Sequence, residues 1–150
     1  MPHSLGFRFL HRQASESGGA STQSRTSVDF LIDGESLLTQ LAEADGGHAD
    51  LMGCLVSGFP EHNQKKLALL VSHAPVETDE GRVLLYVCPE CGDIACGSFA
   101  AKIRINADAV EWSDFAYENG YEPARPLPGI GPFVFSTQGY KSVVTQASAA

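Results

Sequence analysis

The sequence predicts an α+β domain with a mainly antiparallel sheet, two or three helices and a cysteine-rich, zinc-knuckle-like hairpin loop. Three observations lead to this fold class. Residues 98–106 alternate apolar and polar side chains, as a half-exposed antiparallel strand does. Leu37, Leu38 and Leu41 share one face at helical spacing. The strand patterns of the second half follow one another without helices between them, which favours an α+β order over a parallel βαβ order.

Helices and short strands are expected in the first half of the domain. A strand over residues 28–32 is followed by a helix over 35–44, whose apolar face holds the three leucines. An apolar stretch over 51–57 predicts another short strand. Phe59-Pro60-Glu61 places proline at the first position of a second helix. Because the apolar run after it has no clear period, a strand over 66–72 stays an alternative.

The second half is predicted to be rich in strands. The expected strands cover residues 82–87, 98–106, 109–115 and 133–135. Ser136 is suited to cap a closing helix over 137–147, since its hydroxyl can accept a hydrogen bond from the first turn of that helix.

One folded domain and one tail are expected along the 150 residues. Residues 1–27 include a long run rich in serine and glycine and are predicted to form a disordered tail. Such a composition cannot bury enough apolar surface to offset its ordering entropy. Residues 28–150 then form the single domain. No apolar run approaches the roughly 18 residues that a membrane-spanning helix needs, so no membrane partner is expected.

The net charge of −8 indicates the kind of partner. An acidic surface repels phosphate backbones, so nucleic acid is not an expected partner. A basic protein would suit this charge, although acidity that only keeps the chain soluble is the simpler explanation. Three of the four cysteines are clustered, unlike those of disulfide-bonded secreted domains, and Arg8 interrupts the apolar start of the chain. A cytoplasmic location is therefore expected.

The segment Cys88-Pro-Glu-Cys91-Gly-Asp-Ile-Ala-Cys96-Gly97 predicts a structural zinc site. In a C-P-x-C-G turn two thiolates can bind one ion, proline stiffens the turn, and glycine adopts the positive φ that the turn requires. Cys96 can supply a third thiolate. The fourth ligand stays open among Cys54, His48, His62 and His73.

Three other interpretations of the cysteines also stay open. The thiols could be reduced and purely structural. Cys88 and Cys91 could form a redox dithiol, because C-P-x-C also occurs in glutaredoxins. The glycines after Cys91, however, do not predict the helix whose N-terminus lowers a thiol pKa. An iron–sulfur cluster normally has four cysteine ligands, and only three are close in this segment.

A second candidate site is the aromatic and acidic stretch over residues 112–123. The predicted partner-binding residues are Trp112, Asp114, Tyr117, Glu118 and Tyr121. Aromatic rings with neighbouring carboxylates suit a partner that presents arginine or lysine. The alternative is that these rings cover the core near the cysteine loop.

Several segments of the second half carry a resemblance to a known group of proteins. They are Leu84-Leu85, the cysteine loop, Trp112 with Phe115, Gly131-Pro132-Phe133-Val-Phe135 and Tyr140. In these segments the chain resembles a loose group of small uncharacterised bacterial proteins. The resemblance implies a bacterial, cytoplasmic origin and no particular activity.

The sequence as a whole favours a non-enzymatic protein-binding domain with a structural zinc knuckle. It contains no metalloprotease, phosphate-loop or nucleophile-elbow motif. A small, acidic, cytoplasmic chain without catalytic motifs is typical of bacterial immunity proteins, which inhibit a toxin. The alternative function is a thiol-disulfide oxidoreductase that uses Cys88 and Cys91.

Overall fold

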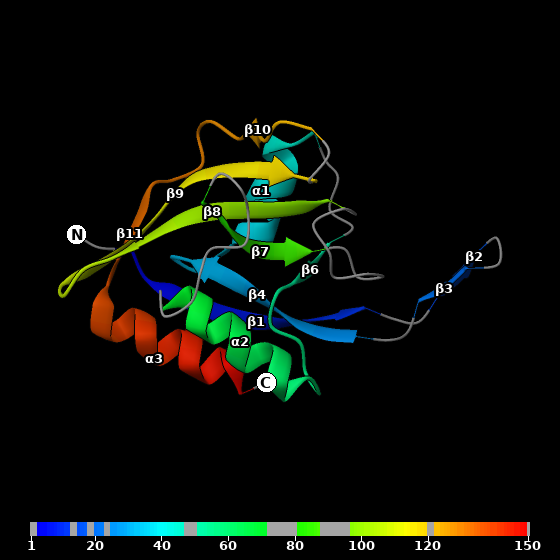
Figure 1. Cartoon of the computed structure of the whole chain (residues 1–150), viewed down its shortest axis with the longest axis horizontal. Helices are drawn as coiled ribbons and strands as arrows, with labels where there is room; N and C mark the ends of the chain where they lie inside the picture. The colour runs from blue at the N-terminus through cyan, green and yellow to red at the C-terminus, as the bar shows by residue number, and fades with distance from the viewer. Residues whose placement is uncertain are drawn as a thin grey trace.

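Antiparallel sheets and three helices make up the described part of the chain (Figure 1). The computed structural model describes residues 3–12, 15–17, 20–22, 25–46, 51–71, 81–87, 97–119 and 122–149. Within these ranges the predicted α+β class with a mainly antiparallel sheet is confirmed. The cysteine loop lies outside them.

The first sheet has the strand order β1-β4-β5. β1 (Leu5–Arg12) pairs antiparallel with β4 (Arg25–Ile32), and β4 pairs with the two-residue β5 (Glu35–Ser36). The predicted strand over 28–32 is therefore confirmed as part of β4. Val28, Phe30 and Ile32 of this strand are buried because their side chains point to the face of the sheet that packs in the main core.

The predicted disordered tail over residues 1–27 is wrong wherever the structure describes it. β1 is a full partner of β4, and β2 (Ser15–Ser17) pairs with β3 (Ala20–Thr22). The serine- and glycine-rich run covers only residues 15–27, and its composition does not describe the more apolar residues 5–10 before it. Leu5 is buried, and Phe7 and Leu10 pack against the core, so through these three residues β1 buries the apolar surface that ordering requires.

The second sheet has the order β10-β9-β8-β7-β6, and β11 pairs with the same strand, β9, as β10 does. Its strands are β6 (Met52–Gly53), β7 (Val83–Val87), β8 (Ser98–Ile105), β9 (Ala109–Glu118), β10 (Arg125–Pro126) and β11 (Phe133–Ser136). The four strands predicted for the second half are confirmed. β9 continues past residue 115 because its last residues pair with β8 on one side and β10 on the other.

Residues 52–57 connect the two sheets, in place of the single strand predicted over 51–57. Met52 and Gly53 pair with β7, after which the chain turns to β4. There the amide of Val28 donates to the carbonyl of Leu55 (2.9 Å). A Cβ atom on Gly53 would lie 1.7 Å from the carbonyl oxygen of Val28. The crossing therefore requires glycine at this position.

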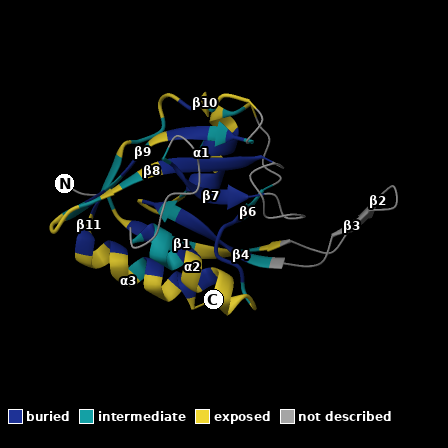
Figure 2. Ribbon diagram, viewed as in Figure 1, coloured by how far each residue is buried: buried dark blue, intermediate teal, exposed yellow. Residues whose placement is uncertain are grey.

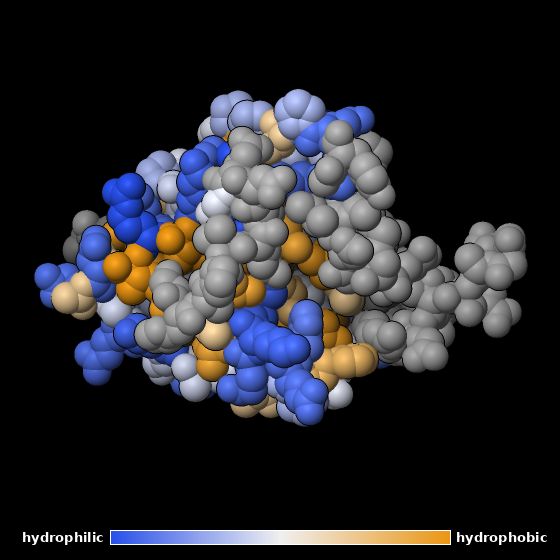
Figure 3. All heavy atoms as spheres, in the orientation of Figure 1, coloured by the Kyte–Doolittle hydropathy of each residue, from blue (hydrophilic) through white to orange (hydrophobic). Residues whose placement is uncertain are grey.

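Three helices cover these sheets. They are α1 (Leu37–Ala44), α2 (Pro60–Leu70) and α3 (Thr137–Ser148). The side chains of Ser36 and Ser136 cap α1 and α3, and Pro60 begins α2 as predicted. Because α2 continues to Leu70, residues 66–70 are helical, which excludes the alternative strand over that range. In Figure 1, α2 and α3 lie side by side below the sheets. α1 lies behind the strands β7, β8 and β9 in this view. Polar side chains dominate the solvent side of α2 (Figure 3).

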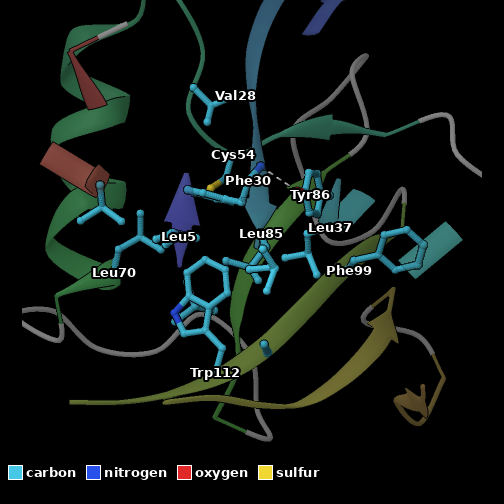
Figure 4. Packing of buried hydrophobic residues seen from close by; sticks show 14 of the residues in the cluster. Leu5, Val28, Phe30, Leu37, Cys54, Leu70, Leu85, Tyr86, Phe99 and Trp112 are labelled. Carbon is cyan, nitrogen blue, oxygen red and sulfur yellow. Dashed lines mark hydrogen bonds between the residues drawn. The ribbon is translucent and has the colours of Figure 1, made fainter. Parts of the chain in front are cut away.

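Trp112 lies at the centre of the main hydrophobic core. Its ring makes edge contacts with Phe30 at 5.2 Å, Phe135 at 5.4 Å and Tyr140 at 5.9 Å between centroids. Its indole N–H donates to the Tyr140 hydroxyl (3.2 Å), which donates to the carbonyl of Leu70 (2.7 Å). Side chains from α1, α2 and both sheets converge here (Figure 4), and Figure 2 shows the buried strands around them.

Asp29 is a fully buried carboxylate that joins β1, β4, β7 and the start of α1. Its oxygens accept hydrogen bonds from the hydroxyls of Tyr86 and Ser36, both at 2.6 Å. They also accept from the amide of Leu38 at 3.3 Å and from Nε of Arg8 at 3.0 Å. Four donors thus replace the water that burial removes, which makes a buried charge tolerable.

Candidate functional site

The three clustered cysteines, Cys88, Cys91 and Cys96, lie outside the described residues, but both strands next to them are described. β7 ends at Val87, directly before the first cysteine, and pairs there with Ser98 at the start of β8. All residues of β7 are buried. The cysteine segment therefore joins the paired ends of two strands that the core holds in place.

Gly97 and Tyr117 fix the exit from this segment. Gly97 has a φ of +95°, and a Cβ atom there would lie 2.4 Å from the Tyr117 hydroxyl oxygen. The Tyr117 ring also makes an edge contact with Phe99 at 6.2 Å. Next along the chain, the Ser98 hydroxyl donates to the carbonyl of Glu118 (2.9 Å). Both the backbone conformation and the space at Gly97 therefore require glycine.

The predicted candidates for a fourth ligand differ in their surroundings. Cys54 is 1% exposed and belongs to the main core. Nε2 of His62 lies 2.8 Å from the carbonyl oxygen of that cysteine. His48 and His73 are outside the described residues. Within the part of the chain that the structure describes, no three His, Cys, Asp or Glu side chains form a group that could hold a metal ion.

The predicted partner-binding residues do not share one surface. Trp112 is 0% exposed and Glu118 is 7% exposed, so the prediction is wrong for both. Trp112 points into the core because it alternates with Glu111 and Ser113 along β9. Tyr117 is half-buried, and the side chain of Asp114 is 41% exposed. Tyr121 lies outside the described residues.

Asp114 and Glu118 belong to an ion-pair cluster with Arg82 and Lys102. The guanidinium of Arg82, 4% exposed, lies 2.9 Å from Asp114 and 3.3 Å from Glu118. Nζ of Lys102 lies 3.0 Å from Asp114. The hydrogen bond from Lys102, followed by that from Arg82, holds the pKa of Asp114 below its usual value. Two cations of the chain itself therefore neutralise the carboxylate that was predicted to attract a basic partner.

A surface pocket of about 430 Å³ lies beside Tyr117, lined by that residue, Asn119 and residues 122–126. The guanidinium carbon of Arg125 lies 4.7 Å from the centre of the Tyr117 ring. Arg125 also forms an ion pair with Asp45, whose side chain is only 2% exposed. Sequence reasoning missed Arg125 and Asp45, because they are 80 residues apart and neither belongs to a motif.

Two buried tyrosines determine how the fold responds to alkaline pH. Burial, and then the charge of Asp29, raises the pKa of Tyr86, and burial raises that of Tyr140. Both shifts favour the neutral phenol in the folded state. The stability that they contribute is complete below the ordinary tyrosine pKa of about 10 and is lost as pH rises through the folded-state values.

We expect Tyr86 and Tyr140 to ionise only when the protein unfolds. In an absorbance titration at 295 nm, part of the tyrosinate signal should therefore rise together with the loss of circular dichroism. Tyr86→Phe should reduce the amplitude of that late step. Ionisation of all four tyrosines near the ordinary pKa, with the circular dichroism still native, would contradict this expectation.

Comparisons with protein-family models, curated proteins and solved structures found no match for this chain. A search of the helices for membrane spans, covering the described ranges, found none long and apolar enough to cross a bilayer.

Proposed function

We propose that this chain is a non-enzymatic protein-binding domain in which Cys88, Cys91 and Cys96 hold a structural zinc ion. The observation that carries the proposal is the position of the cysteine segment between Val87 and Ser98. These paired residues belong to β7, which is buried throughout, and to the buried start of β8. A zinc ion there would cross-link the loop to a base that is already rigid. Metal binding would then add to the folding free energy of the domain.

The proposed partner is a basic protein, and the proposed role is that of a bacterial immunity-type inhibitor of a toxin in the cytoplasm. Support comes from the net charge of −8 and from the absence of a catalytic motif in the sequence. Of the residues first considered for the contact, Asp114 and Tyr117 keep exposed surface. Because Lys102 and Arg82 neutralise Asp114, the proposed contact centres on Tyr117 and its pocket.

The metal content of the untagged protein tests the zinc proposal. We expect one zinc ion per chain by elemental mass spectrometry, with thiols that react only after a chelator is added. Cys88→Ser, Cys91→Ser and Cys96→Ser should each lower the zinc content, because each removes a thiolate ligand. Cys54→Ala tests the one candidate fourth ligand that lies in the core, and we expect this variant to keep the zinc because its thiol packs among apolar side chains.

The opposite result has an equally clear meaning. A metal-free protein with a reversible disulfide between Cys88 and Cys91 would contradict the zinc proposal. If that protein also reduced insulin, and Cys88→Ser abolished the activity, the chain would be a thiol-disulfide oxidoreductase. Zinc-loaded protein without reductase activity supports the non-enzymatic proposal.

A further inference from the structure

Arg125 is held on two sides while most of its side chain faces solvent. The ring of Tyr117 covers one face of the guanidinium, and the shielded carboxylate of Asp45 pairs with its edge. The Arg125 side chain is nevertheless 59% exposed. Tyr117 is itself fixed, since its hydroxyl lies against Gly97 and its ring contacts Phe99. A planar cation is thus fixed in the wall of a pocket before any ligand arrives.

The chemistry of this pocket selects a flat aromatic ring over a cation or an anion. A cation is disfavoured because Arg125 already covers the Tyr117 ring. An anion gains little, because Asp45 neutralises Arg125 and Glu122 adds a further carboxylate to the lining. The face of the guanidinium that Tyr117 does not cover can stack on another aromatic ring. Pro123 and Pro126 add rigid apolar walls to the same pocket.

We propose that this pocket binds a tryptophan or tyrosine side chain of the partner protein, stacked on the guanidinium of Arg125. The ring would then lie on the opposite side of the guanidinium from Tyr117. The carboxylate of Glu122 offers an acceptor for the indole N–H or the phenol O–H. A volume of about 430 Å³ is ample for one such side chain. Tryptophan, tyrosine and arginine are also the residues most enriched at the energetic centres of protein interfaces.

This inference rests on the proposed function in one respect, since it assigns the ring to a protein. Its test uses small probes and does not require the partner. Two-dimensional amide NMR of the full chain is recorded during titrations with N-acetyltryptophanamide, N-acetyltyrosinamide, N-acetylleucinamide and adenosine. We expect the two aromatic amides to shift the amide resonances of Tyr117, Glu122, Ala124 and Arg125, with millimolar affinity, and leucinamide to leave them unchanged.

Variants of Arg125 provide the decisive comparison. Arg125→Lys keeps the positive charge but removes the planar surface, and should weaken the binding of N-acetyltryptophanamide roughly threefold. Arg104→Lys, at an exposed arginine of β8, should leave it unchanged. Equal shifts with leucinamide, no shifts at this pocket, or equal affinity in Arg125→Lys would each overturn the proposal. Binding of adenosine alone would also overturn it, in favour of a nucleobase ligand.

Failure of this test can be told apart from failure of the proposed function. The zinc measurement reports on the cysteine segment, whereas the probe titration reports on the pocket. A zinc-loaded protein whose pocket ignores aromatic probes would overturn the inference and leave the zinc proposal intact.

Discussion

Replacing Asp29 with alanine is expected to lower the free energy of unfolding by about 3 kcal/mol. The substitution removes the shared acceptor of four hydrogen bonds. The Tyr86 hydroxyl and the Leu38 amide are buried and would each lose a partner that water cannot replace. Arg8 contributes less to the loss, because its side chain is 52% exposed and regains hydration.

Urea unfolding followed by circular dichroism measures this loss. Ser36→Ala is the matched control, since it removes one of the four donors and the cap of α1, and should cost about 1 kcal/mol. Asp29→Asn should fall between the two, because an amide keeps one acceptor oxygen but brings two donors of its own. If Asp29→Ala cost no more than Ser36→Ala, the carboxylate would not be the centre of this network.

The second large effect is expected at Trp112. Trp112→Ala should lower the free energy of unfolding by about 3–5 kcal/mol, because it leaves a cavity at the centre of the core. It also removes the indole that donates to Tyr140 and that contacts Phe30 and Phe135. A residue on a partner-binding surface would show the opposite pattern, with lower affinity and little change in stability.

Thermal and urea unfolding of Trp112→Ala and Trp112→Phe distinguish these patterns. Trp112→Phe keeps an apolar ring and should cost less than the alanine variant, although it loses the hydrogen bond to Tyr140. As a surface control, Arg104→Lys changes an exposed side chain of β8 and should change stability by less than about 1 kcal/mol. Native-like stability in Trp112→Ala would contradict the central place of this ring.

The elements that could be predicted from the sequence are those with a strong local signal. The leucine spacing of α1, the alternation of β8, Pro60 at the start of α2 and the Ser136 cap each indicate their structure within a few residues. These signals depend only on the period of the element or on its first turn.

The parts that could not be predicted depend on contacts between distant segments. β1 is stable because β4 and the core take up its apolar side chains, and its own composition does not reveal this. The Arg125 site needs Tyr117 and Asp45 from other elements. Trp112 could have been placed correctly, since the alternation over residues 109–113 of β9 puts it on the same face as the buried Val110. The prediction of a partner-binding role rested on the aromatic ring next to carboxylates, and not on the alternation of the strand.

The hydrogen bonds between His3 and Val134 have a consequence for synthesis of the chain. The amide of His3 donates to the carbonyl of Val134 (2.6 Å), and the amide of Val134 donates to Nδ1 of His3 (3.1 Å). During translation β1 and β4 can pair early, but β11, which receives His3, emerges from the ribosome more than a hundred residues later. Before the second half of the chain is made, the apolar side of the first sheet has no cover from β9, β11 or α3. A nascent chain at that stage is therefore the form of this protein most in need of a chaperone.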